Sequence, residues 1–317
     1  MMSDPIIQTF NLTKLFDQKT LAVNKLSITV KPGIYGFLGP NGAGKTTTIK
    51  MLIGSLFPTE GRIEIFGKDA LGKDIADIHK RIGYVPENPT YFMDMTGEEL
   101  LEYVGSVFKI PQQKLISRIS NLLRLVDLQD AKSRKIAKYS AGMKQRIGIA
   151  QALINDPDLL ILDEITSNLD PLGRSKMVNL LKGLKNEGKT IFISTHILPE
   201  IEKMEADSIG IINQGQLILE GSIKELNEKL GTKIIKISPK HDLLREKLKH
   251  YALNIGETAD ELIIESDNPD QVWKIVNRIS MENDIIINKF ISSGLEIEQL
   301  FMKAFDITKK DIGVENK

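Results

Sequence analysis

The stretch FLGPNGAGKTTTIKML, residues 37–52, decides the fold because it joins a glycine-rich loop to the start of a helix. From residue 39 it reads G-P-N-G-A-G-K-T, the pattern of a phosphate-binding loop. Glycine lets the backbone approach an anion closely, and the N–H groups at the start of the following helix attract that anion. The stretch therefore predicts a phosphate site made by Gly39, Pro40, Asn41, Gly42, Ala43, Gly44, Lys45, Thr46 and Thr47.

Two residues at the end of this loop have separate roles. Lys45 is expected to neutralise the β- and γ-phosphates of a nucleotide, and the Thr46 hydroxyl is expected to ligate Mg²⁺. An apolar segment at residues 34–38 precedes the loop, and apolar residues recur at helical spacing after it. This context favours a nucleotide site over the alternative, a plain glycine-rich turn between a strand and a helix.

The composition limits the class of protein. A chain of 317 residues with 41% hydrophobic and 26% charged residues is long enough for two packed domains. Its formal net charge of +0 argues against a nucleic-acid partner, and its lack of cysteine excludes disulfides. Neither a signal pattern at the start nor a long apolar run is found, so we expect a soluble, intracellular chain.

Strand-like and helix-like segments alternate through most of the chain, which predicts an α/β fold with a largely parallel sheet between helices. The pattern changes to mainly helical at about residues 90–155. Residues 1–230 are expected to form an ATPase domain. After a linker helix, residues 231–317 alternate again and predict a small α+β domain, in which Trp273 is expected to pack in the core with its helical neighbours.

A second run of sequence names the family. The stretch YSAGMKQRIGIAQALINDPDLLILDEITSNLDP, residues 139–171, precedes a strand that ends in STH at residues 194–196. Together with the phosphate loop, these motifs resemble the nucleotide-binding subunits of ABC transporters, and the likeness covers about residues 5–230. The resemblance implies a P-loop NTPase with a RecA-like core, an antiparallel β subdomain and a helical subdomain, and it implies ATP and Mg²⁺ as cofactors.

The family pattern also assigns roles after the apolar strand LLILDE. Asp163 is expected to hold Mg²⁺, and Glu164 is expected to act as the general base on the attacking water. His196 matches the family's switch histidine, which contacts the γ-phosphate. The alternative for the two carboxylates is a solvated acidic pair that closes a strand.

The sequence YSAGM occupies the place of the family's signature, whose usual form is LSGGQ. Ser140 and Gly142 keep the two positions that touch phosphate, whereas Ala141 adds a methyl group that the family seldom has there. In the family this motif completes the ATP site of a partner chain, so two subunits enclose two ATP molecules head to tail. SNLD at residues 167–170 resembles the D-loop that links the two sites.

Two further positions carry weaker signals. Phe16 lies where the family stacks an aromatic ring on adenine, and this family position favours stacking, although aromatic residues at strand ends more often belong to the core. Glu87 stands where most relatives have a glutamine that ligates Mg²⁺ and senses the membrane partner. Together with GMKQR and the C-terminal domain, this glutamate resembles the branch that exports drugs, antibiotics, sodium or polysaccharide.

The resemblance implies an energy-coupling subunit of an exporter. Its partners would be a second ATPase subunit, in a homodimer or a heterodimer with a paralogue, and a separate polytopic transmembrane permease, with no nucleic acid. The chain would then lie in the cytoplasm, peripherally on the inner face of the cell membrane. A soluble ABC ATPase that acts on ribosomes or DNA, and an import subunit, are the alternatives; the cargo is not specified by these residues.

Overall fold

The computed structural model describes residues 4–17, 19–167, 169–251 and 253–311. The chain forms two compact units, residues 1–220 and residues 221–317. The division falls before helix α8 (Ile223–Leu230), whereas the sequence placed that helix at the end of the first domain. The helix is grouped with the second unit because it packs against α11 (Ile297–Asp311) there.

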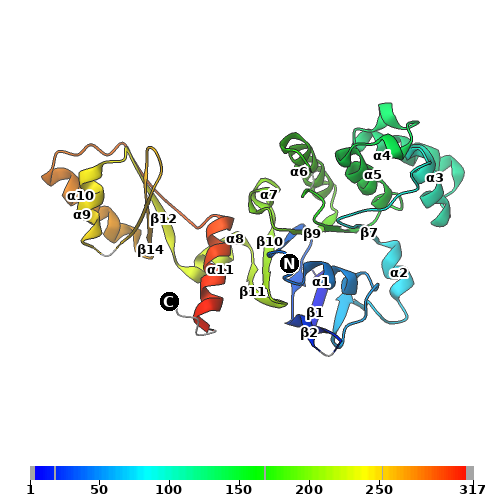
Figure 1. Ribbon diagram of the computed structural model, residues 1–317, viewed down its shortest axis with the longest axis horizontal. Helices are drawn as coiled ribbons and strands as arrows, with labels where there is room; N and C mark the ends of the chain where they lie inside the picture. Colours follow the sequence, from blue (N-terminus) through cyan, green and yellow to red (C-terminus); the bar gives the residue numbers. More distant parts are fainter. Residues whose placement is uncertain (1–3, 18, 168, 252, 312–317) are drawn as a thin grey trace. The chain divides into compact units, whose positions relative to one another are not determined.

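The first unit is built on a sheet with the strand order β11-β10-β4-β9-β8-β7. Neighbouring strands from β10 to β7 run parallel, and β4, β8 and β9 are buried along their whole length because helices cover both faces. Figure 1 shows α6 and α7 on one side of this sheet and α1 on the other. The strands are β4 (Ile34–Leu38), β7 (Ile82–Val85), β8 (Leu159–Asp163), β9 (Thr190–Thr195), β10 (Ser208–Asn213) and β11 (Gln216–Gly221), and the helices are α1 (Lys45–Leu52), α6 (Pro171–Asn186) and α7 (Leu198–Lys203).

A second sheet of the first unit is antiparallel and has the order β2-β1-β5-β6, with β3 paired to β1. Its buried aliphatic residues share one hydrophobic core with Phe37 of β4 and with Ile49 and Met51 of α1. This shared core fixes the start of α1 between the two sheets. The strands are β1 (Ile7–Phe16), β2 (Thr20–Leu26), β3 (Thr29–Val30), β5 (Glu60–Ile65) and β6 (Lys68–Asp69), and helix α2 (Ile75–Lys80) precedes β7.

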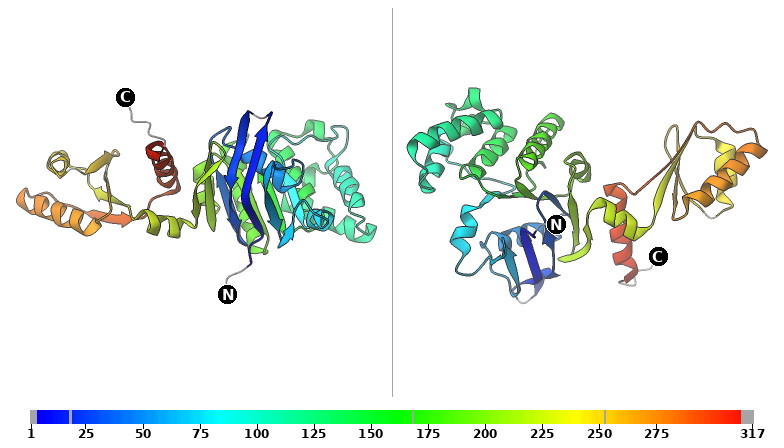
Figure 2. Two further views of the ribbon diagram at one scale, coloured as in Figure 1. Left: turned by 90° about the horizontal axis from the view of Figure 1, so that it is seen from below. Right: turned by 180° about the vertical axis from the view of Figure 1, so that it is seen from behind.

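The helical part of the first unit lies between β7 and β8, as the sequence predicts. Its helices are α3 (Gly97–Val107), α4 (Gln112–Leu125) and α5 (Ala141–Ala152), with short 3-10 turns at Gln129–Ala131 and Ile136–Lys138. Helix α3 contacts both α4 and α5, and the three helices lie side by side in Figures 1 and 2. Thr96 accepts a hydrogen bond from the Glu99 N–H, and the Glu99 carboxylate accepts one from the Thr96 N–H, so a capping box fixes the start of α3.

The second unit has an antiparallel sheet with the order β13-β14-β12-β15. Helices α9 and α10 contribute buried aliphatic residues to one core with this sheet, which agrees with the α+β character expected from the sequence. The elements are β12 (Lys233–Ser238), α9 (Asp242–Lys249), β13 (Asn254–Glu257), β14 (Leu262–Ser266), α10 (Pro269–Glu282) and β15 (Lys289–Ser293).

Trp273 corrects one expectation about this unit. Its helical neighbours Val272, Val276 and Ile279 are buried, but Trp273 itself is 42% exposed and packs edge-to-face on Phe290. The core prediction for Trp273 is therefore wrong, because its position in α10 lies at the edge of the apolar stripe and its ring covers the edge of the core.

The side chain of Asn227 in α8 donates hydrogen bonds to the carbonyls of Ile223 and Leu295, which ties α8 to the segment before α11.

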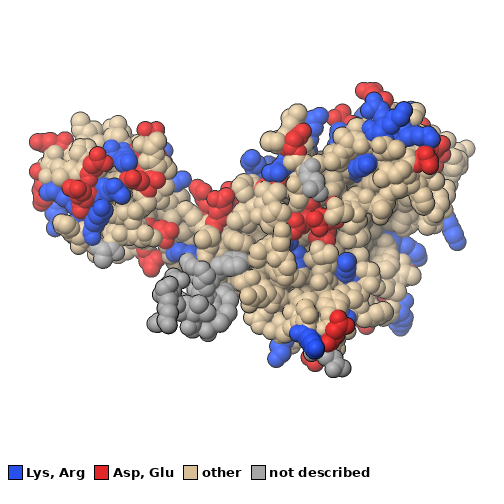
Figure 3. Space-filling view, in the orientation of Figure 1, with Lys and Arg blue, Asp and Glu red and all other residues tan. Residues whose placement is uncertain are grey.

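The surface carries charges of both signs. Figure 3 shows basic and acidic residues mixed on each unit, with large uncharged areas between them, on the face that it presents. Within the part of the chain that the structure describes, we find no helix with the length and apolar character needed to cross a bilayer.

Candidate functional site

The phosphate-loop sequence forms the connection between β4 and α1. Gly39 must be glycine because a Cβ atom there would lie 2.5 Å from the carbonyl oxygen of Ile212. Gly42 has a φ of +79°, and a Cβ atom built on it meets no described atom within 4 Å, so its backbone faces open space. No side chain among the described residues caps the first turn of α1. Its N–H groups therefore point into that space as an anion site would require.

Lys45, the first residue of α1, is buried and turned back over the loop. Its ammonium donates hydrogen bonds to the carbonyl oxygens of Gly39, at 2.8 Å, and Pro40, at 3.0 Å. It also forms an ion pair with Glu164 Oε1 at 2.9 Å. Three protons on the ammonium thus have three partners, and the loop and the end of β8 are joined through one side chain.

Glu164 follows β8 and is 7% exposed. Its Oε2 atom accepts hydrogen bonds from Ser167 Oγ, at 3.1 Å, and lies 2.9 Å from His196 Nδ1. Burial alone would raise the pKa of this carboxyl, but the hydrogen bond and charge of Lys45, with smaller contributions from His196 and Ser167, hold the pKa of Glu164 below its ordinary value. The carboxylate is therefore ionised and placed to accept a proton at neutral pH.

The register between β8 and β9 explains how these groups meet. Asp163 is paired with Ser194 in the parallel ladder, and Leu38 of β4 is paired with Thr195 of the same strand. Ser194 Oγ donates to Asp163 Oδ1 at 2.6 Å and accepts from the Glu164 N–H at 3.1 Å. The carboxyl ends of β4, β8 and β9 thus meet at one edge of the sheet, where ligands bind in folds of this type.

A pocket of about 420 Å³ lies at this edge. It is lined by Ala22, Asn41, Gly42, Gly44, Lys45, Thr46, Thr47, Glu87, Glu164, Ser167 and His196. We call it the nucleotide pocket. Most of the loop residues predicted to bind phosphate lie on it. The carbonyl oxygens of Gly39 and Pro40 instead accept hydrogen bonds from the Lys45 ammonium, and the side chain of Ala43 is buried.

Asp163 and Phe16, predicted to contact Mg²⁺ and adenine, also do not line the nucleotide pocket. Asp163, the residue before Glu164, is buried, and its Oδ1 atom accepts a hydrogen bond from Ser194 Oγ. Phe16, at the end of β1, is 37% exposed, and the Lys14 ammonium lies 5.2 Å from its ring centroid. The roles of Asp163 on Mg²⁺ and of Phe16 on adenine stay predictions.

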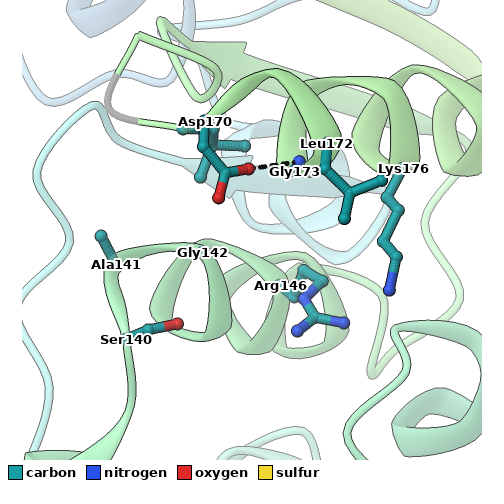
Figure 4. Close-up of a pocket in the computed structure, with 9 residues that line it drawn as sticks. Ser140, Ala141, Gly142, Arg146, Asp170, Leu172, Gly173 and Lys176 are labelled. Carbon is teal, nitrogen blue, oxygen red and sulfur yellow. Dashed lines mark hydrogen bonds between the residues drawn. The ribbon is translucent and has the colours of Figure 1, made fainter.

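The signature residues lie in a different place. Ser140 and Gly142, at the start of α5, line a second pocket of about 370 Å³, which we call the signature pocket. Figure 4 shows them across from Leu172 and Gly173 of α6 and from Asp170, the N-cap residue of that helix, whose carboxylate accepts a hydrogen bond from the Gly173 N–H. Ser140 Oγ accepts from the Met143 N–H and so begins α5. Of the predicted D-loop, residues 167–170, Ser167 lines the nucleotide pocket and Leu169 and Asp170 line the signature pocket, while Asn168 lies outside the described residues.

The residues present suit magnesium with a nucleotide rather than a metal held by protein alone. No group of three or more acidic, histidine or cysteine side chains among the described residues could form a metal cage. Mg²⁺ needs no cage, because it binds through one or two carboxylates together with substrate phosphates. The Thr46 hydroxyl and the Glu87 carboxylate line the nucleotide pocket and are oxygen ligands of the kind that Mg²⁺ prefers.

Sequence reasoning missed two serines of this site. Ser194 joins Asp163 to the Glu164 backbone, and Ser167 holds the Glu164 carboxylate. Ser167 stands in the SNLD motif, which gave a signal for the segment but not for this hydrogen bond. Ser194 gave none, because a serine near the end of a buried strand is common.

Comparison with known proteins agrees with this geometry. The family model described as ABC transporter matches residues 23–167. The bacitracin transport ATP-binding protein BcrA of Bacillus licheniformis is 39% identical over 303 residues, which is 94% of this chain and 96% of that protein. The Nod factor export ATP-binding protein I of Burkholderia lata is 38% identical over 263 residues, covering 82% of this chain and 86% of that protein.

A solved structure gives the same result for the fold. The structure of cbiO1 from Clostridium perfringens, described as part of the ABC transporter complex cbiONQ, matches with a TM-score of 0.64 and 28% identity, over 72% of this chain and 96% of that one. The P-loop NTPase fold expected from the sequence is thereby confirmed. Given the relatives that match along almost its whole length, the chain belongs to the family of ABC transporter ATP-binding proteins.

Proposed function

We propose that this chain hydrolyses ATP to drive export through a separate membrane-spanning subunit, and that two ATPase subunits close around ATP in each cycle. The single observation that carries the proposal is the position of Glu164, which contacts both Lys45 and His196 on the wall of the nucleotide pocket. The names of the two relatives, a bacitracin transport protein and a Nod factor export protein, support a role in transport, and the second supports the export direction.

In this proposal each polar residue of the nucleotide pocket has a role in the reaction. Lys45 neutralises charge on the β- and γ-phosphates, and His196 contacts the γ-phosphate. Glu164 takes a proton from the water that attacks the γ-phosphorus while the bond to the ADP oxygen breaks. Thr46, Asp163 and Glu87 would hold Mg²⁺, which supplies further neutralisation of phosphate charge. The lowered pKa of Glu164 supports its role because it keeps the base ionised.

The proposal also accounts for the separation of the two pockets. Ser140 and Gly142 line the signature pocket and not the nucleotide pocket. A second chain arranged head to tail would bring its signature residues onto the ATP of the first, and each closed dimer would hold two ATP molecules. The second chain would be either a copy of this chain or a paralogue.

Replacement of Gly142 by alanine tests the dimer. A Cβ atom at Gly142 would lie 3.6 Å from Leu169 Cδ2, an ordinary contact, so the single chain tolerates it and its helix α5 gains stability. In the closed dimer the added methyl group would separate the α5 N–H groups from the partner's phosphate. We expect an unchanged or higher thermal midpoint, with ATP turnover lowered about tenfold, equivalent to the loss of one hydrogen bond to a charged group.

The control is Gly183→Ala in α6, an exposed helical glycine with open space at its Cβ position. This variant should match the Gly142→Ala gain in thermal stability and keep normal turnover. Normal turnover in Gly142→Ala would contradict the head-to-tail dimer.

Replacement of Glu87 by glutamine tests whether this residue couples the nucleotide pocket to the membrane partner. Glu87 lines the pocket, and its backbone carbonyl accepts a hydrogen bond from Gln145 of α5 at 3.1 Å. Removing the carboxylate charge should leave ATP affinity nearly unchanged and lower partner-stimulated ATPase about fivefold, the low end of a typical coupling free energy. Basal and stimulated rates would be measured in vesicles, and an unchanged ratio of the two would count against this role for Glu87.

The alternative of a soluble ABC ATPase on ribosomes or DNA has less support. On the face that Figure 3 presents, Lys and Arg are mixed with Asp and Glu and form no continuous basic area. The two relatives reported above carry transport and export names. A position on the inner face of the membrane, reached through the permease, agrees better with these observations.

The deciding experiment is purification of the chain from its native membranes in mild detergent, followed by mass spectrometry of the bound proteins. A matched sample carrying Glu164→Gln, kept in ATP, would favour the closed complex. Recovery of a polytopic membrane protein is expected. Recovery of ribosomal or DNA-bound proteins without a membrane protein would overturn the transport proposal while leaving the family assignment intact.

A further inference from the structure

Glu200 is a buried carboxylate that the roles described above do not use. It lies in α7 and is 4% exposed. Its Oε2 atom accepts a hydrogen bond from Thr166 Oγ1, and its Oε1 atom has no hydrogen-bond partner within the described part of the chain. The guanidinium of Arg174 forms an ion pair with Glu200, with Nε 3.7 Å from Oε1. Burial removes this carboxylate from water, and its few hydrogen bonds offset little of that free-energy cost, so its position calls for an explanation.

The two partners of Glu200 hold opposite ends of one short segment. Thr166 is fully buried and follows Glu164 by two residues. Arg174 donates a hydrogen bond from Nε to the carbonyl of Leu169 at 2.9 Å, and the Leu169 N–H donates to the Thr166 carbonyl at 3.1 Å. One carboxylate is therefore linked to the beginning of the segment directly and to its end through Arg174.

The described residues 164–167 and 169–170 of this segment reach both pockets, and we call these residues the connecting segment. Glu164 and Ser167 line the nucleotide pocket. Leu169 and Asp170 line the signature pocket, where Figure 4 shows Asp170 above Ser140 and Gly142. A displacement of the connecting segment would thus move groups in both pockets together.

The ion pair of Glu200 and Arg174 is expected to contribute little to the stability of the fold. A buried ion pair seldom stabilises a fold more than well-packed apolar side chains do, and this pair lacks a direct hydrogen bond between carboxylate and guanidinium. Burial raises the pKa of Glu200, and the hydrogen bond from Thr166 and the charges of Arg174 and His196 offset only part of that effect. A leucine of similar volume would serve packing at least as well.

We propose that Glu200 is a positioning residue, which with Thr166 and Arg174 fixes the connecting segment so that Glu164 and Asp170 are set in their two pockets at once. The inference rests on the proposed function, since its kinetic consequence is a change in ATP turnover. Glu200 does not line the nucleotide pocket, so its loss should affect the rate of the reaction rather than the binding of ATP.

The test compares Glu200→Gln and Glu200→Leu with the control Glu205→Gln, an exposed carboxylate just after α7 that pairs with Lys182. The ATP affinity of both Glu200 variants should stay within about twofold, and kcat should fall about tenfold because a small misplacement of a reacting group is costly. Glu200→Leu should keep or raise the thermal midpoint. The control should match the wild-type chain in every measurement.

A second readout does not depend on turnover. Amide hydrogen exchange of the purified chain should become faster in the connecting segment of both Glu200 variants and stay unchanged in the phosphate loop, residues 39–46. Unchanged exchange in the connecting segment would overturn the proposal, as would a loss of protection spread over both regions with a lower thermal midpoint. If the wild-type chain itself hydrolysed no ATP, the proposed function would fail, and hydrogen exchange alone would decide the positioning role.

Discussion

Replacing Glu164 by glutamine is expected to lower ATP turnover by about a hundredfold or more, the usual contribution of a general base. Glutamine keeps the shape of the side chain, and its amide oxygen can still accept a hydrogen bond from Lys45, while its amide nitrogen can donate to Ser167 Oγ; it cannot take a proton from water. ATP affinity should stay the same or rise, because a negative charge next to the phosphates is removed. ATP-bound dimer should therefore accumulate.

The measurements are steady-state phosphate release, ATP affinity by titration, and size-exclusion chromatography with ATP present. Glu205→Gln provides the control, since it removes the same charge from an exposed site. Turnover within about threefold of the wild-type rate would exclude Glu164 as the base, because general-base catalysis contributes far more than that.

Replacing Lys45 by methionine is expected to weaken ATP binding by about tenfold to a hundredfold, as follows from the loss of one or more hydrogen bonds to a charged group. Methionine fills part of the space of the buried lysine stem. It leaves the carbonyls of Gly39 and Pro40 and the carboxylate of Glu164 without their donor. The pKa of Glu164 should rise, because Lys45 is the main group that lowers it.

Titration with ATP compares this variant with Lys50→Met, which changes an exposed lysine at the other end of α1. The Lys50 variant should bind ATP normally. Equal affinity in the two variants would show that Lys45 does not contact the phosphates.

The motifs were sufficient to predict the sheet edge and most of the nucleotide pocket. A phosphate loop and an acidic strand end imply parallel neighbouring strands, and parallel strands end at the same edge of a sheet. The pairing of Asp163 with Ser194 follows from that topology, but the hydrogen bonds of Ser194 depend on register, which single residues do not reveal.

Burial of individual residues was harder to foresee. Glu200 stands in the short segment LPEIEK, where a charged side chain normally faces water, yet tertiary packing encloses it. Trp273 shows the opposite case, an apolar residue that stays partly exposed because the sheet beneath α10 ends there with Phe290. Periodicity predicts which face of a helix is apolar, but the partner surface decides how far burial extends around it.

Under the proposed function, the three bonds of the Lys45 ammonium make the entry of ATP an exchange of partners. A phosphate oxygen can reach this ammonium only by replacing one of its partners, and the Glu164 carboxylate is the partner that the anion repels. Once displaced, Glu164 loses the cation that most lowers its pKa and becomes a stronger base, while Ser167 still holds its other oxygen. In this proposal Glu164 gains proton affinity when a nucleotide phosphate reaches Lys45, so an empty subunit does not carry an activated base.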